Sequence, residues 1–142
     1  MKLSGFAAEI LLMLAAGVAV AQTAPPVAQE PSRTAWLGVW QNDFDGQPGV
    51  IVTLADDTGE LGGTVVLNMI SRESGEPRVV GSVPHVMVHP RADNETLTFE
   101  VKTPRAPRIM KQFVMVLKSD GTAIIHCPNC DVAPAVELTK KW

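Results

Sequence analysis

Thr96-Leu97-Thr98-Phe99-Glu100-Val101-Lys102 is a stretch in which every second residue is apolar. Side chains of a β-strand point alternately to its two faces, so Leu97, Phe99 and Val101 share one face. The other face carries threonine, glutamate and lysine side chains, whose polar and charged groups are solvated by water. The stretch therefore predicts a β-strand with one side on a hydrophobic core.

Similar runs lie on both sides of this strand. Val50, Val52 and Leu54 alternate with other residues in the same way, whereas residues 64–69 and 112–118 are apolar on both faces over part of their length, which is typical of central strands. Further strands are predicted at residues 79–82, 86–88, 122–126 and 136–139. Helical periodicity is not sustained anywhere in the predicted domain.

The whole pattern predicts an all-β domain, an antiparallel meander of about eight or nine strands. Closure into a barrel is the economical arrangement because it removes exposed strand edges. A β-sandwich is the alternative, since it requires the same alternation.

Turn residues separate the runs. Residues 119–122 contain Asp120-Gly121, which favours a two-residue type I′ hairpin because both central residues accept positive φ. Residues 56–59 and 92–95 predict two more hairpin loops. Pro84 and Pro90 flank another run and predict a short edge strand between them.

The N-terminal 21 residues have the composition of a cleavable signal peptide: Lys2, an apolar segment over residues 10–20, and Ala19-Val20-Ala21 before Gln22. As a helix the apolar segment rises only about 16 Å, against about 30 Å for a bilayer core, so cleavage is favoured over a membrane anchor. Residues 22–34 predict a flexible Pro/Ala-rich leader and residues 35–142 a single domain. We expect an exported protein, periplasmic or extracellular.

Composition excludes several classes of function. The formal net charge is −3, 19% of residues are charged, and there are three Trp, four Phe and no Tyr, which argues against a nucleic-acid surface. No later run is long enough for a membrane span. No cofactor motif and no Gly-x-Ser-x-Gly elbow are present, so the sequence predicts no cofactor and favours a protein that is not an enzyme.

The segment Leu37-Gly38-Val39-Trp40-Gln41 contains the Gly-x-Trp motif that opens the first strand of lipocalins and their calycin relatives, and it precedes a β meander as in those proteins. The chain resembles them in this respect, although their second and third motifs are not recognisable. The resemblance implies that Trp40 packs across the closed end of a barrel and that Gly38 allows close backbone approach. The whole mature chain from Ala35, with Gly38, Trp40 and the runs 46–50 and 59–65, also looks like a group of small secreted bacterial proteins that carries no known activity.

The lipocalin resemblance further implies binding of a small apolar molecule in the mouth of the barrel. The alternation pattern predicts which side chains line the interior, first as core and, at the open end, as ligand contacts: Val52, Leu54, Val65, Leu67, Leu97, Phe99, Phe113 and Met115.

His85, Met87 and His89 lie at i, i+2 and i+4, so on a regular strand they share one face. Imidazole and thioether ligands suit copper. However, the two histidines would be about 13 to 14 Å apart on a straight strand, so a single ion requires a bend. The alternative is an ordinary polar edge of a sheet.

Cys127 and Cys130 form a Cys-x-x-Cys pair after His126. Such a pair is a redox dithiol, part of a zinc site or a structural disulfide. A strand precedes the pair, whereas redox pairs open a helix, and the oxidising compartment favours a disulfide that braces the loop between the last two strands.

Arg105 and Arg108 lie on the Pro-stiffened stretch 103–108, which suits an acidic partner, although exposed arginines are commonly only solvated.

The sequence leaves three functions open: a binder of a small apolar ligand, a periplasmic copper or zinc protein, and a module that docks on an envelope partner. The sequence does not determine the oligomeric state.

Overall fold

The computed structural model describes residues 33–131 and 133–142. The predicted signal peptide and residues 22–32 of the predicted leader lie outside the described residues. The described part consists of one 3-10 turn and eight strands: η1 (Arg33–Ala35), β1 (Gly38–Phe44), β2 (Gln47–Asp57), β3 (Glu60–Ser71), β4 (Arg78–Asp93), β5 (Thr96–Thr103), β6 (Ala106–Leu117), β7 (Ala123–His126) and β8 (Val136–Lys140). Within these residues no helix is long and apolar enough to cross a membrane.

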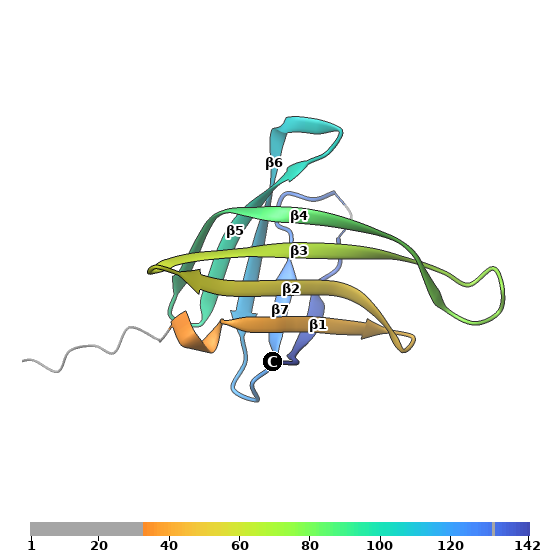
Figure 1. Ribbon diagram of the computed structural model, residues 1–142, viewed down its shortest axis with the longest axis horizontal. Helices are drawn as coiled ribbons and strands as arrows, with labels where there is room; N and C mark the ends of the chain where they lie inside the picture. The colour runs from red at the N-terminus through yellow and green to blue at the C-terminus, as the bar shows by residue number, and fades with distance from the viewer. Residues whose placement is uncertain (1–32, 132) are drawn as a thin grey trace, which may run out of the picture.

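Each strand pairs antiparallel with the next, and β8 returns to β1, so the meander closes into a barrel (Figure 1). This confirms the predicted all-β meander, and closure decides for the barrel over the sandwich. The closing seam is short: only Trp40 with Lys140 and Gln41 with Thr139 are paired between β1 and β8.

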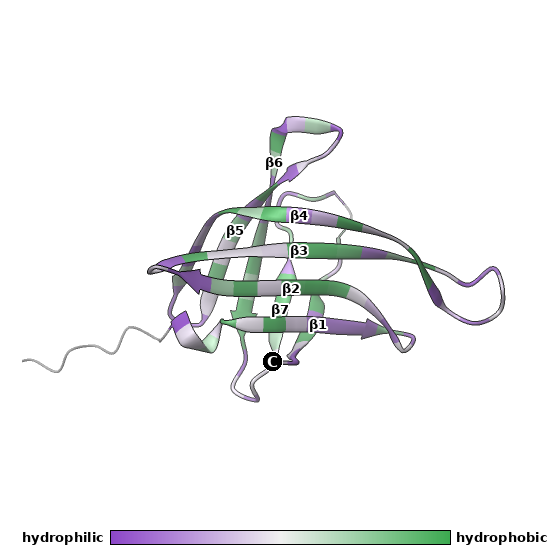
Figure 2. Ribbon diagram, viewed as in Figure 1, coloured by the Kyte–Doolittle hydropathy of each residue, from purple (hydrophilic) through white to green (hydrophobic). Residues whose placement is uncertain are grey.

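The barrel interior is the hydrophobic core. On β5 the predicted alternation holds, because Leu97, Phe99 and Val101 are buried. Phe99 stacks on Phe113 of β6, with ring centroids 5.5 Å apart. Figure 2 shows hydrophobic residues along the middle of β2 and β3, whereas the second half of β1 is hydrophilic.

One end of the barrel is closed by two tryptophans. Trp36 follows η1, and both Trp36 and Trp40 are 1% exposed. The Trp40 Nε1–H donates to the Trp36 carbonyl oxygen at 2.8 Å. Lys140 of β8 donates through Nζ to the Ala35 carbonyl oxygen, and the same ammonium lies 5.5 Å from the centre of the Trp40 ring. These contacts fix the N-terminal segment across the end of the barrel.

Strand β4 differs from the prediction. The expected runs 79–82 and 86–88 belong to one strand of 16 residues, and this strand lies between β3 and β5 rather than at an edge, so the edge-strand prediction is wrong. Pro90 falls in an irregularity of the β4–β5 register between Val88 and Arg91, where regular ladder hydrogen bonds are interrupted. A proline is tolerated there without ending the strand.

The β6–β7 turn also differs. Gly121 has a φ of 84° and its N–H donates to the Lys118 carbonyl oxygen, while the Lys118 N–H donates to the Thr122 carbonyl oxygen. The loop therefore has three residues, not two, and only its glycine needs positive φ. Two-residue turns with positive φ at both central positions occur instead at Asp45-Gly46 and Thr58-Gly59.

Candidate functional site

An apolar cavity lies at the end of the barrel opposite the two tryptophans. We call it the open-end cavity; its volume is about 290 Å³, and it is lined by Val50, Leu67, Phe113, Ile125, His126, Cys127, Cys130, Ala133, Pro134 and Val136. Strands β2, β3, β6, β7 and β8 all contribute to it. Apart from His126 these residues are apolar, so the cavity suits an apolar group.

The predicted ligand-contact residues divide between core and cavity. Leu67 and Phe113 line the open-end cavity. The others are buried in the packed part of the barrel, each at most 2% exposed: Val52, Leu54, Val65, Phe99 and Met115, together with Leu97. The interior is thus filled from the tryptophan end, and free space begins near Leu67 and Phe113.

A second hollow adjoins the cavity. It has a volume of about 370 Å³, and its wall shares Val50, Leu67, Pro134 and Val136 with the open-end cavity. A third hollow, beside the β1–β8 seam, is also lined by Val136. Val136 therefore borders all three hollows. It is the first residue of β8 and comes before Thr139 and Lys140, the β8 residues that pair with β1. The sequence placed Val50 on the same face as Val52 and Leu54 and Val136 at the start of a strand, but it assigned neither to a ligand site, because alternation alone does not show where the seam opens.

The connection between β7 and β8 forms one wall of the cavity. Cys127 and Cys130 are joined by a disulfide, as the sequence predicted, and both line the cavity. The bond makes both sulfurs part of an apolar wall and removes the thiolates that zinc or redox chemistry would need.

Asn129 fixes this loop to β6. Its Oδ1 accepts from the Gln112 N–H at 2.9 Å, and its Nδ2–H donates to the Met110 carbonyl oxygen at 3.2 Å. The Asn129 carbonyl oxygen accepts from Nζ of Lys111 at 3.3 Å. The amide side chain thus continues the β6–β7 ladder past His126 and holds the disulfide loop over the cavity.

We expect Asn129→Ala to lower the free energy of unfolding by about 1–2 kcal/mol, because two hydrogen bonds are lost. Asn129→Asp keeps the acceptor for Gln112 but removes the donor to Met110, and should cost about half as much. Urea unfolding followed by circular dichroism measures both. Equal stability of Asn129→Ala and the unchanged protein would show that the loop is held by other contacts.

The histidines of β4 do not share a face. His85 is paired with buried Val65 and Met87 with buried Val101, so both face the interior. His89 lies in the register irregularity with a φ of 50°, and its Nδ1 is 3.3 Å from Oε2 of Glu100. Because one extra residue of β4 in this irregularity shifts the alternation, His89 lies apart from the other two. Among the described residues, no three His, Cys, Asp or Glu side chains form a group that could hold a metal ion.

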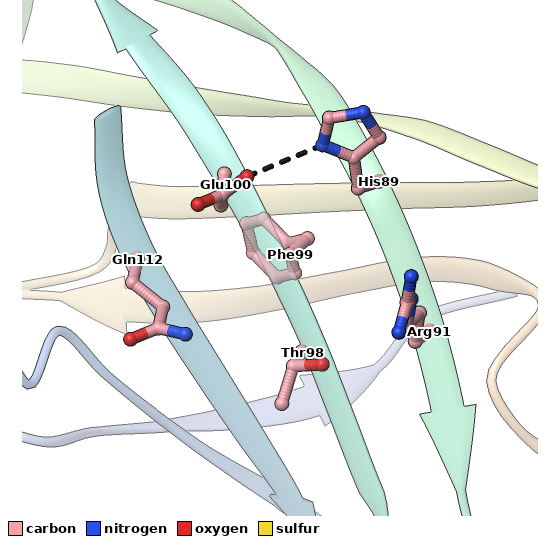
Figure 3. A pocket seen from close by; sticks show the side chains of 6 residues that line it. All are labelled: His89, Arg91, Thr98, Phe99, Glu100 and Gln112. Atoms are coloured by element: carbon pink, nitrogen blue, oxygen red, sulfur yellow. Dashed lines mark hydrogen bonds and ion pairs between the residues drawn. The ribbon is translucent and has the colours of Figure 1, made fainter. Parts of the chain in front are cut away.

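His89 contributes instead to a polar hollow on the outer wall, shown in Figure 3. The hollow is about 340 Å³ and is lined by His89, Arg91, Thr98, Phe99, Glu100 and Gln112 from β4, β5 and β6. The His89 and Glu100 side chains are 73% and 37% exposed, so water competes with the contact between them.

Among the described residues, three surface side chains have shifted pKa values, and none of them lines the open-end cavity. A hydrogen bond from Gln41, followed by one from Lys141, lowers the pKa of Asp43. Hydrogen bonds from Thr122 lower the pKa of Asp120, and a hydrogen bond to Glu137 raises the pKa of Lys118. These groups stabilise the β1–β8 seam and the β6–β7 turn rather than a reaction centre.

Comparison with protein-family models, with curated proteins and with solved structures gives no match to this chain. The class is therefore defined by architecture alone: a closed, eight-stranded antiparallel β-barrel with an apolar cavity at one end. This architecture is compatible with the lipocalin-like barrel that the resemblance around Trp40 implies.

Proposed function

We propose that the protein is an exported, lipocalin-like binding protein that holds one small apolar molecule in the open-end cavity. The observation that carries the proposal is the cavity itself, which combines a wall of apolar side chains with a position at the unfilled end of a closed barrel. The predicted signal peptide supports export, as does the disulfide between Cys127 and Cys130.

The size of the cavity limits the ligand. Its 290 Å³ lies near the lower end of the range of roughly 300–1,000 Å³ for small-molecule sites. Since one water molecule occupies about 30 Å³ in the liquid, the space is equivalent to about ten waters. A short alkyl chain or a single ring system suits it, and a large polycyclic molecule does not.

A series of 1-alkanols from hexanol to dodecanol tests this function by isothermal titration calorimetry. Each added methylene should tighten binding about threefold to fourfold, because burial of one methylene contributes about 0.8 kcal/mol. The gain should stop once the chain fills the cavity, and the heat-capacity change should be negative. Absence of binding by every alkanol would overturn the proposed function.

Val136→Phe should fill the space where the three hollows meet and weaken decanol binding at least about tenfold, because the added ring displaces several buried methylenes of the ligand. Val86→Phe is the matched control, since Val86 is 71% exposed and its ring would lie in water. The control should bind decanol like the unchanged protein. Equal affinity of the two variants would place the ligand elsewhere.

A further inference from the structure

The β5–β6 hairpin projects beyond β4 (Figure 1). Along β6 the hairpin lies on the side of Phe113, which lines the open-end cavity, rather than on the side of buried Met115. It carries four cations, Lys102, Arg105, Arg108 and Lys111, and no acidic residue occurs between Val101 and Leu117. The first three side chains are exposed and Lys111 is half-buried. Within the part of the chain that the structure describes, none of the four takes part in an ion pair.

Lys111 occupies the inner face of the barrel. It is paired with Val101, which is 4% exposed, and directly opposed residues of neighbouring strands share a face. Phe113, two residues further along β6, lines the open-end cavity. Lys111 therefore lies about one strand repeat, roughly 7 Å, from the cavity wall on the side of the mouth. Its ammonium donates to the Asn129 carbonyl oxygen, which is a neutral partner.

An apolar cavity with unpaired cations at its mouth suits a molecule with an alkyl chain and an anionic group. A carboxylate or phosphate accepts strong hydrogen bonds from ammonium and guanidinium groups. Exposed Ile109, which lies between Arg108 and Lys111 in the sequence, adds apolar surface beside these charges.

We propose that the open end binds an anionic amphiphile, with its alkyl chain in the open-end cavity and its carboxylate or phosphate beside Lys111 and the arginines of the β5–β6 hairpin. This inference rests on the proposed function, whose ligand class it specifies.

Decanoate, decanol and decylamine have the same chain length and differ in the charge of the headgroup. At low salt we expect decanoate to bind about five- to tenfold more tightly than decanol, and decylamine to bind most weakly. The preference for decanoate should shrink as salt screens the cations. Decyl phosphate distinguishes a phosphate ligand from a carboxylate ligand. Tighter binding of decyl phosphate than of decanoate indicates a phospholipid-type headgroup, and weaker binding indicates a fatty acid.

Lys111→Met keeps the apolar stem and removes the charge, so it should bring decanoate to the affinity of decanol while leaving decanol within about twofold of its original value. The double variant Arg105→Gln/Arg108→Gln should reduce the preference in the same direction. Lys118→Met is the matched control, because Lys118 follows β6 at the opposite end of the barrel. This variant should keep the preference for decanoate over decanol that the unchanged protein shows.

The outcomes separate the two proposals. Decanol binding without a preference for decanoate over decylamine would overturn the headgroup inference and leave the proposed function standing. A preference that survives in Lys111→Met and in the double arginine variant would also overturn it. Absence of binding by all three compounds would overturn both.

Discussion

Trp40→Ala is expected to lower the free energy of unfolding by about 3–5 kcal/mol, a large share of the roughly 5–15 kcal/mol that stabilises a small domain. Trp40 is 1% exposed, and its truncation leaves a cavity between Trp36 and Lys140. The substitution also removes the N–H that donates to the Trp36 carbonyl oxygen, so the N-terminal turn keeps the hydrogen bond from Lys140 to Ala35 but loses one of its attachments to the barrel. Urea unfolding followed by far-ultraviolet circular dichroism measures the loss.

Trp142→Ala is the matched control, because the Trp142 side chain is 83% exposed and only its backbone oxygen bonds to β1. Its cost should stay below about 0.5 kcal/mol. Trp40→Phe should fall between the two, since a ring remains but the hydrogen bond is lost. If Trp40→Ala and Trp142→Ala were equally stable, the closed end would not depend on the tryptophan pair.

Alternation predicted the barrel because each strand has one face in a packed interior and the other in water. The run over residues 96–102 became β5 with its three apolar side chains buried, and the pattern at Val52 and Leu54 became the buried face of β2. These assignments depend only on side chains two residues apart. They need no knowledge of which strands become neighbours.

The prediction was wrong where a local irregularity replaced a regular element. Pro84 and Pro90 suggested a short edge strand, but Pro84 lies opposite Val66 within the β3–β4 ladder and Pro90 occupies the irregularity in β4. The same irregularity gives His89 a positive φ and separates it from His85 and Met87. Tertiary pairing on both sides of β4 outweighed the local preference of proline, and a sequence does not display that pairing.

The candidate site was only partly accessible from sequence. A small barrel is filled by its own side chains over part of its length, and alternation marks every inward position alike. Leu67 and Phe113 differ from Val65 and Met115 only in their height along the barrel. That height follows from strand stagger and from the short β1–β8 seam, both of which are long-range properties. The disulfide was predictable, because the preceding strand and the expected oxidising compartment favour a disulfide between Cys127 and Cys130 over a redox dithiol or a zinc site.

Gly38→Ala should destabilise the barrel by about 3 kcal/mol or more, because it combines backbone strain with a steric clash at the closing seam. Gly38 has a φ of 120°, a conformation that an alanine rarely adopts, and an added Cβ would overlap the backbone carbonyl of Trp142. That carbonyl oxygen accepts from the Val39 N–H, and the Lys141 N–H donates to the Val39 carbonyl oxygen at 2.8 Å. The substitution therefore opens the seam between β1 and the C-terminus.

Gly62→Ala provides the comparison, since a Cβ at Gly62 of β3 meets open space and the backbone there has no positive φ. It should change stability by less than about 1 kcal/mol. Hydrogen exchange distinguishes a seam defect from general loosening: in Gly38→Ala the amides of Val39 and Lys141 should lose protection before those of β5. The seam between β1 and β8 has the fewest paired residues in the barrel, so strain at Gly38 should open the seam before the other strand pairs. Uniform loss of protection across the strands would contradict this account.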